Sequence, residues 1–184
     1  MIEQVIEYFV TAYEINPLAQ IIGAIGFLVS IYNFLFCENK KFIIFTAVAS
    51  VAFGFHYYSL GLIAAAGVNA FDVVKNLLSL KYERNLKLVL GFSLIYLIIG
   101  YLTYTGELVS IIPTLTALAS TYLVFYVRGI WLNIGFLFII LMWMVYNYLG
   151  NSIGGLSTDI FLIGFGLLGI LRQILKNNKK SKNA

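Results

Sequence analysis

Seven long apolar stretches, separated by short polar or glycine-containing breaks, run through almost the whole of this sequence. A transmembrane α-helix needs about 20 mostly apolar residues to cross roughly 30 Å of hydrocarbon. The stretches have about this length, and they fall at residues 17–37, 42–60, 62–80, 86–104, 108–126, 130–149 and 152–175. The pattern therefore predicts an all-α polytopic membrane protein with seven transmembrane helices.

The composition excludes a water-soluble domain of ordinary size. Hydrophobic residues make up 61% of the 184 positions and charged residues 11%, whereas soluble domains are about half apolar and a quarter charged. The single cysteine, Cys37, excludes an internal disulfide and a cysteine-rich metal site. We expect neither a metal ion nor another cofactor.

The least marked break lies between 42–60 and 62–80, where only Ser59 and Gly61 interrupt the apolar sequence. An unbroken helix from 42 to 80 would be about 58 Å long at 1.5 Å per residue, nearly twice the hydrocarbon thickness. We therefore expect the chain to turn near residue 60.

Basic residues give an independent test of the helix count, because cytoplasmic loops collect Lys and Arg. If the helices alternate in direction, the N-terminal segment and the breaks near 60, 106 and 151 share one side, and they contain no Lys or Arg. Apart from Lys75, every basic residue falls on the other side: Lys40, Lys41, Lys81, Arg84, Lys87, Arg128, Arg172, Lys176, Lys179, Lys180 and Lys182. This split predicts an N-terminus outside and a C-terminus in the cytoplasm.

The two ends of the chain are amphipathic and basic, respectively. In residues 1–16, apolar residues recur at helical spacing, and Glu3, Glu7 and Glu14 interrupt any run long enough to span. We predict a short helix on the outer membrane surface that ends near Pro17, and no signal peptide, because a basic n-region is missing. The tail at 176–184 is interpreted as cytoplasmic charge that attracts anionic lipid, not as a nucleic-acid site.

Sliding the sequence by 89 residues indicates an internal repeat. The shift places "YYSLG" (57–61) on "YNYLG" (146–150) and Phe36 on Phe125. It predicts a 3+1+3 architecture with three-helix units at 17–80 and 108–175 and a linker helix at 86–104. Both units start outside and end inside, so an axis along the membrane normal would relate them.

The first 85 residues carry a glycine-rich first helix, a lysine pair, a histidine followed by Leu-Gly, small residues and then asparagine. The segments are "QIIGAIGFLVSIYNFLFCENKKFIIF" (20–45) and "FGFHYYSLGLIAAAGVNAFDVVKN" (53–76). In these features the chain resembles the YgjV family, which implies a bacterial inner membrane protein without a settled substrate. The 3+1+3 arrangement is similar to that of SWEET sugar transporters and, more distantly, nicotinamide riboside transporters. That similarity implies three-helix units around a central substrate path.

Polar residues in the predicted helix 62–80 need a partner that lipid cannot provide. With this helix entering the outer leaflet near Leu62, Asn69 lies about 10 Å deep and Asp72 about 15 Å, at the midplane. Four polar residues form one stripe with Lys75 at its edge: Asn69, Asp72, Asn76 and Ser79. The stripe is either the wall of a substrate cavity, with Asp72 as acceptor or proton-binding group, or a structural pair in which Lys75 snorkels toward the cytoplasm.

Aromatic residues and the only histidine concentrate near the predicted helix ends. His56 either contacts a polar substrate or is a hydrogen-bonded residue of the membrane interface. We interpret the outer tyrosines as an interfacial belt: Tyr57, Tyr101, Tyr104, Tyr146 and Tyr148. Trp143 lies in mid-helix, opposite Gly54 in the repeat, so its indole either stacks on a ring-shaped ligand or packs in the core.

The second half offers fewer polar candidates. The repeat places Thr158 at the position of Asn69, which predicts a second polar wall. A competing interpretation, which we favour, makes Ser157 to Asp159 a helix N-cap at the membrane surface. Asn147 can join either arrangement, and Pro113 is either a gating kink or an ordinary first-turn proline.

Two functions remain. The first is a transporter or facilitator for a small polar solute, in which one three-helix unit rocks against the other. The second is a membrane scaffold or a module that binds a lipid or a protein partner. We expect no enzyme, because the sequence lacks a nucleophile, base and orienting group at converging spacing and a glycine-rich phosphate loop. Membrane lipids are expected partners, and assembly into a homo-oligomer stays open.

Overall fold

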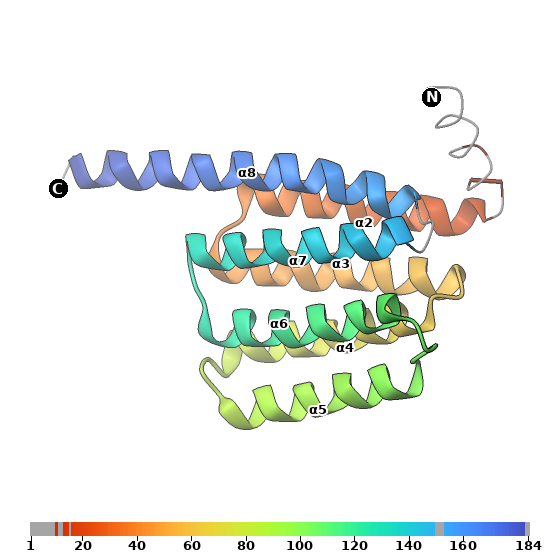
Figure 1. Ribbon diagram of the computed structural model, residues 1–184. Helices are drawn as coiled ribbons and strands as arrows, with labels where there is room; N and C mark the ends of the chain where they lie inside the picture. The colour runs from red at the N-terminus through yellow and green to blue at the C-terminus, as the bar shows by residue number, and fades with distance from the viewer. Residues whose placement is uncertain (1–9, 11–12, 15, 150–152, 183–184) are drawn as a thin grey trace.

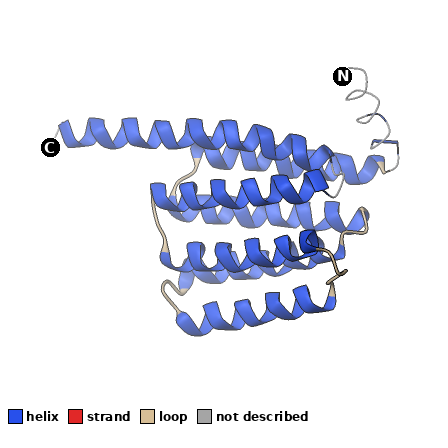
Figure 2. Cartoon of the chain, in the orientation of Figure 1, coloured by secondary structure: helices blue, strands red, loops and turns tan. Residues whose placement is uncertain are grey.

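A computed structural model describes residues 10, 13–14, 16–149 and 153–182 of the chain. Every regular element in this part is helical (Figure 2). The α-helices are α2 (Pro17–Phe36), α3 (Asn39–Ser59), α4 (Ile63–Lys81), α5 (Leu86–Leu102), α6 (Ile112–Tyr126), α7 (Ile130–Leu149) and α8 (Ile153–Lys182), and the 3₁₀-helix η1 (Leu108–Ile111) precedes α6. The all-α class and the seven helices are confirmed, whereas most of the predicted surface helix at 1–16 lies outside the described residues.

Six of the helical segments are long and apolar enough to cross a membrane, and α5 is a shorter apolar helix. With 17 residues, α5 is at the lower limit of about 17 residues for a span. Large apolar side chains cover the outside of the bundle, among them Leu18, Phe55 and Phe138, each more than 60% exposed. Such a surface is suited to lipid, so polar groups must be placed inside.

Gly61 produces the predicted turn between α3 and α4. Its φ of +75° lies in the left-handed region that favours glycine. The amide of Leu62 donates to the carbonyl of Tyr57 at 2.9 Å, and the amide of Gly61 donates to the carbonyl of Tyr58 at 3.0 Å. These two bonds form a Schellman motif, which satisfies carbonyls that the end of α3 would otherwise leave free.

Six helices form a closed ring, with α5 outside it (Figure 1). Helices α2, α3 and α4 pack in chain order, as do α6, α7 and α8. The two groups meet where α2 contacts α8 and where α4 contacts α6, and α5 packs on α4 and α6. The internal repeat and its symmetry axis stay predictions, since the ring describes contacts and not sequence similarity.

Aromatic pairs join α3 and α7 across the ring at two levels. Toward the start of α3, the rings of Phe42 and Phe136 meet edge to face with centroids 5.2 Å apart. Toward the end of α3, Tyr57 and Trp143 stack with centroids 5.5 Å apart and planes 15° apart. Aromatic contacts of this kind stabilise each pair by about 0.5–1.5 kcal/mol beyond burial.

At one end of the bundle, loop residues near the basic positions are bonded to the ends of other helices. The amide of Arg84 donates to the carbonyl of Phe125 at 3.0 Å, and Lys176 pairs with Glu38 at 2.8 Å. Helix α8 continues to Lys182, through most of the predicted basic tail (Figure 1).

Candidate functional site

A cavity of about 120 Å³ lies inside the ring, and residues from all six ring helices line it. A bound water needs about 10–15 Å³ on the same measure, so the cavity has room for several waters or a small solute. The Phe42–Phe136 and Tyr57–Trp143 pairs bracket it, since Phe136, Tyr57 and Trp143 belong to its lining. Aromatic rings therefore border the cavity at two levels along α3 and α7.

Helix α4 contributes Asn69 and Asp72 to the lining, as the cavity hypothesis predicted. Asn69 is 8% exposed, and its amide donates to the carbonyl of Ala65 one turn earlier at 2.9 Å. Asn76 and Ser79, from the same predicted stripe, are buried but do not belong to the lining. Only the half of the stripe nearer the start of α4 therefore faces the cavity.

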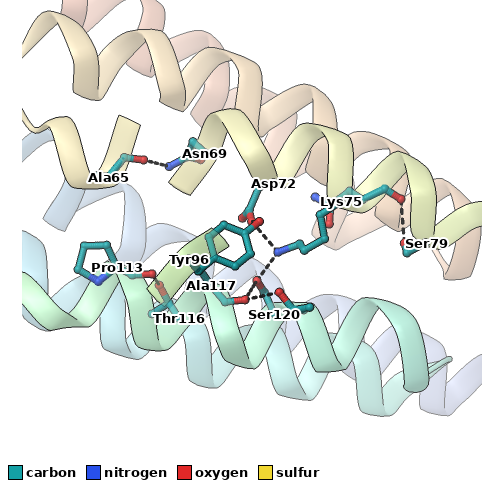
Figure 3. A network of polar contacts seen from close by, with 12 residues as sticks. Ala65, Asn69, Asp72, Lys75, Ser79, Tyr96, Pro113, Thr116, Ala117 and Ser120 are labelled. Carbon is teal, nitrogen blue, oxygen red and sulfur yellow. Dashed lines mark hydrogen bonds and ion pairs between the residues drawn. The ribbon is translucent and has the colours of Figure 1, made fainter. Parts of the chain in front are cut away.

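Asp72 and Lys75 form a buried ion pair (Figure 3). Lys75 Nζ lies 2.5 Å from Asp72 Oδ1 and donates to Ser120 Oγ on α6 at 2.5 Å. The Tyr96 hydroxyl on α5 donates to the same Asp72 Oδ1 at 2.5 Å. Lys75 Nζ also lies 5.3 Å from the centroid of the Tyr96 ring.

The snorkelling interpretation of Lys75 is wrong. Its side chain is 0% exposed and is directed at α6, not at the headgroups. The reason is that an acceptor on another helix, Ser120, and the carboxylate of Asp72 together replace water around the ammonium group. Asp72 remains 17% exposed and lines the cavity, so it is both a cavity residue and a paired residue.

The N-cap interpretation of Ser157 to Asp159 is also wrong, because α8 already begins at Ile153. Thr158 and Asp159 instead line the cavity from α8. Asp159 is 7% exposed, and its Oδ2 accepts a hydrogen bond from Asn147 Nδ2 on α7 at 2.8 Å. Glycine at 155 lets α8 pack closely on α7, because a Cβ at this position would collide with the Asn147 side chain.

The predicted outer tyrosine belt holds only in part. Tyr101 and Tyr148 are 84% and 67% exposed, as a belt requires. Tyr57 and Tyr146 do not belong to such a belt, because they are only 6% and 8% exposed. Both pack against the ring of Trp143. Trp143 therefore lines the cavity with an aromatic cluster behind it.

His56 and Pro113 lie away from the ion pair. His56 is 3% exposed, with Nδ1 2.8 Å from the carbonyl of Ala19; a carbonyl can only accept, so Nδ1 carries the proton. His56 lines a neighbouring cavity of about 430 Å³, which Thr158 also lines. Pro113 is in the first turn of α6, where its carbonyl accepts from the Thr116 hydroxyl at 2.8 Å.

Sequence reasoning did not find Tyr96 and Ser120. Tyr96 is a tyrosine in the middle of α5, where an interfacial belt does not account for it. Ser120 belongs to a group of hydroxyl residues on α6 that includes Thr116 and Thr121. A mid-helix tyrosine and a cluster of hydroxyl residues are signals that the sequence does carry. Their common partner, Lys75, could be identified only from the packing of α4, α5 and α6. Across the described residues, no three His, Cys, Asp or Glu side chains gather closely enough to hold a metal ion.

The helices and their polar interior define a multi-pass membrane protein with an internal cavity. The chain matches the Imp-YgjV family, described as bacterial inner membrane protein, over residues 17–177, and it belongs to that family. It is 26% identical over 155 residues to inner membrane protein YgjV of Escherichia coli (strain K12), and the aligned region covers 84% of each chain. No solved structure matches it. The similarity to SWEET transporters stays a prediction.

Proposed function

We propose that this inner membrane protein carries a small polar solute through the central cavity by opening it to each side in turn. The observation that carries the proposal is a polar-lined cavity between two aromatic contacts of the same helix pair. Separation of α3 from α7 at Phe42–Phe136 would open one end, and separation at Tyr57–Trp143 would open the other. Rocking of one three-helix unit against the other provides such a movement.

The cavity lining supports a polar solute. Asn69, Asp72, Thr116 and Thr158 present amide, carboxylate and hydroxyl groups. Exposing such groups to hydrocarbon costs several kcal/mol each, so their gathering inside indicates an interior that holds water or a solute. In the proposed orientation the N-terminus is outside and the basic end of the bundle is cytoplasmic, in keeping with the distribution of Lys and Arg.

Ligand-induced stabilisation tests this proposal. Purified protein is screened by thermal shift against sugars, nucleosides, vitamins and amino acids, because a ligand that binds only the folded state raises the melting temperature. A true ligand should stabilise the parent more than Asn69→Ala. Ser79→Ala is the matched control, since Ser79 is a buried polar residue of the same helix outside the lining.

Uptake then separates transport from binding. Proteoliposomes that contain the parent are expected to accumulate the identified ligand above empty vesicles, and those with Asn69→Ala are expected to accumulate less. A ligand that binds but never enters above the level of empty vesicles contradicts the proposal.

One observation favours the alternative, a lipid-binding module. A groove of about 640 Å³ between α3 and α4 is lined almost entirely by apolar residues, including Val51, Phe55 and Val74. Its apolar lining suits an acyl chain, and Ala70 belongs to that lining. Native mass spectrometry is expected to show lipid retained by the parent and lost from Ala70→Phe if the groove holds lipid; equal retention contradicts this function.

A further inference from the structure

The charges at the cavity do not balance. Asp72 and Asp159 both line it, while Lys75 lies beside it and pairs with Asp72. Lys, Arg and His are missing from the described residues of the lining. An ionised Asp159 would therefore leave one uncompensated negative charge inside the membrane.

The surroundings of Asp159 supply a hydrogen bond but no cation. In the described contacts its partner is the amide of Asn147, at 2.8 Å. The titratable groups that face this region are Tyr57 of α3, 6% exposed, and Tyr146 of α7, 8% exposed. His56 of α3 lines the neighbouring cavity and is bonded to the carbonyl of Ala19.

The other charged groups cannot compensate Asp159. The ammonium of Lys75, on α4, is held between Asp72 and Ser120. The sequence segments 1–16 and 150–152, at the same predicted side as Asp159, contain no Lys or Arg. A lone carboxylate in a membrane interior is costly, and protonation is the change that removes its charge without a new partner.

We propose that Asp159 is a proton-binding site of the cavity and carries a proton when the cavity is free of solute. The step forms one O–H bond between a carboxylate oxygen and a proton delivered by water, and it needs no other reactant. Asp72 differs from Asp159 in having a cation, because the ammonium of Lys75 bonds its Oδ1, which also accepts from the hydroxyl of Tyr96. Use of Asp159 as the coupling site for solute movement rests on the proposed function.

The chain contains two aspartates, Asp72 and Asp159, which makes the proposal directly measurable. In protein labelled with carboxyl-¹³C aspartate and reconstituted in lipid at neutral pH, infrared spectra are expected to show one labelled carboxylic acid and one labelled carboxylate. In Asp159→Glu the new carboxyl group is unlabelled, so the labelled acid band is expected to vanish. In Asp72→Glu the labelled acid band is expected to remain.

Two results would overturn the proton site: two labelled carboxylates in the parent, or a labelled acid band that survives in Asp159→Glu. The parent spectrum decides the first result even if a variant does not fold, and either variant alone assigns the band. If uptake of an identified solute does not change with an imposed pH gradient, Asp159 is not a coupling site. If the parent takes up no solute above the level of empty vesicles, both the coupling role and the proposed function are contradicted. The proton site itself is decided by the spectra alone.

Discussion

Lys75 shows how a single charged side chain is stabilised at membrane depth. A lysine at a helix centre costs about 2.5–3.5 kcal/mol on insertion scales. Three groups from three helices compensate it: the Asp72 carboxylate, the Ser120 hydroxyl and the Tyr96 ring. The spacing of Asp72 and Lys75 predicted their pairing, but no local pattern could identify partners 21 and 45 residues away in the chain.

Removal of one partner of this pair is expected to be more harmful than removal of both. Lys75→Met leaves the Asp72 carboxylate without its cation, and we expect a loss of about 3–5 kcal/mol in the free energy of unfolding. The double variant Asp72→Asn/Lys75→Met is expected to recover most of that loss. Unfolding in detergent micelles measures the cycle, with exposed Lys81→Met of the same helix as control.

The second single variant of the cycle is Asp72→Asn. If the loss in the double variant equals the sum of the losses in the two single variants, Asp72 and Lys75 do not interact, and the buried pair is contradicted.

Cys37, in the loop between α2 and α3, is expected to react slowly. It is 2% exposed, and burial raises the pKa of its thiol above the ordinary value of 9.0, while the charge of Lys41 partly opposes this. Maleimide attacks the thiolate, so labelling at neutral pH should be much slower in folded than in unfolded protein and should rise as the pH becomes alkaline. Equal rates would contradict the burial.

The same pKa difference predicts the sign of a pH effect on stability. Because the folded state holds the thiol proton more tightly, this contribution is present below the unfolded pKa and is lost as the pH rises above it. Cys37→Ser, which cannot ionise in this range, is the control and should lack this alkaline loss.

At the scale of the helices, the apolar runs predicted α2 to α7 to within a few residues, because each break contains a real stop signal such as Gly61. The last apolar run, at 152–175, also starts within one residue of α8, so it was the N-cap interpretation of Ser157 to Asp159 that was wrong. The helix runs through Gly154 and Gly155, and at Gly155 a Cβ would collide with Asn147 of α7. A glycine in a membrane helix can mark close packing as well as an end.

Two glycines of α8 provide a matched test of this packing. A Cβ at Gly169 would collide with the backbone carbonyl of Phe34 on α2, whereas a Cβ at Gly164 meets no atom within 4 Å. Gly169→Ala is expected to lower the free energy of unfolding by about 1–3 kcal/mol. Gly164→Ala is expected to be neutral or to stabilise by about 0.5–1 kcal/mol. Equal effects in the melting curves would show that α2 and α8 do not approach closely at Gly169.

At the scale of the whole molecule, the ring of six helices creates a cavity that no single helix encodes. The polar stripe predicted that Asn69 and Asp72 face inward, and the repeat predicted Thr158 on a second wall; all three line one cavity. The two aromatic pairs and the position of Asp159 could not be predicted, because they depend on how α3, α7 and α8 meet across the interior.

Thiol accessibility tests most directly whether this interior is open to water. In a Cys37→Ser background, Ser30→Cys places a thiol in the cavity lining, and Leu28→Cys places one of similar depth on the 65% exposed lipid face. We expect a membrane-impermeant thiol reagent to modify Ser30→Cys from each side of the membrane and to leave Leu28→Cys unmodified. If Ser30→Cys is as unreactive as Leu28→Cys from both sides, the cavity is a dry packing defect and the proposed solute path is contradicted.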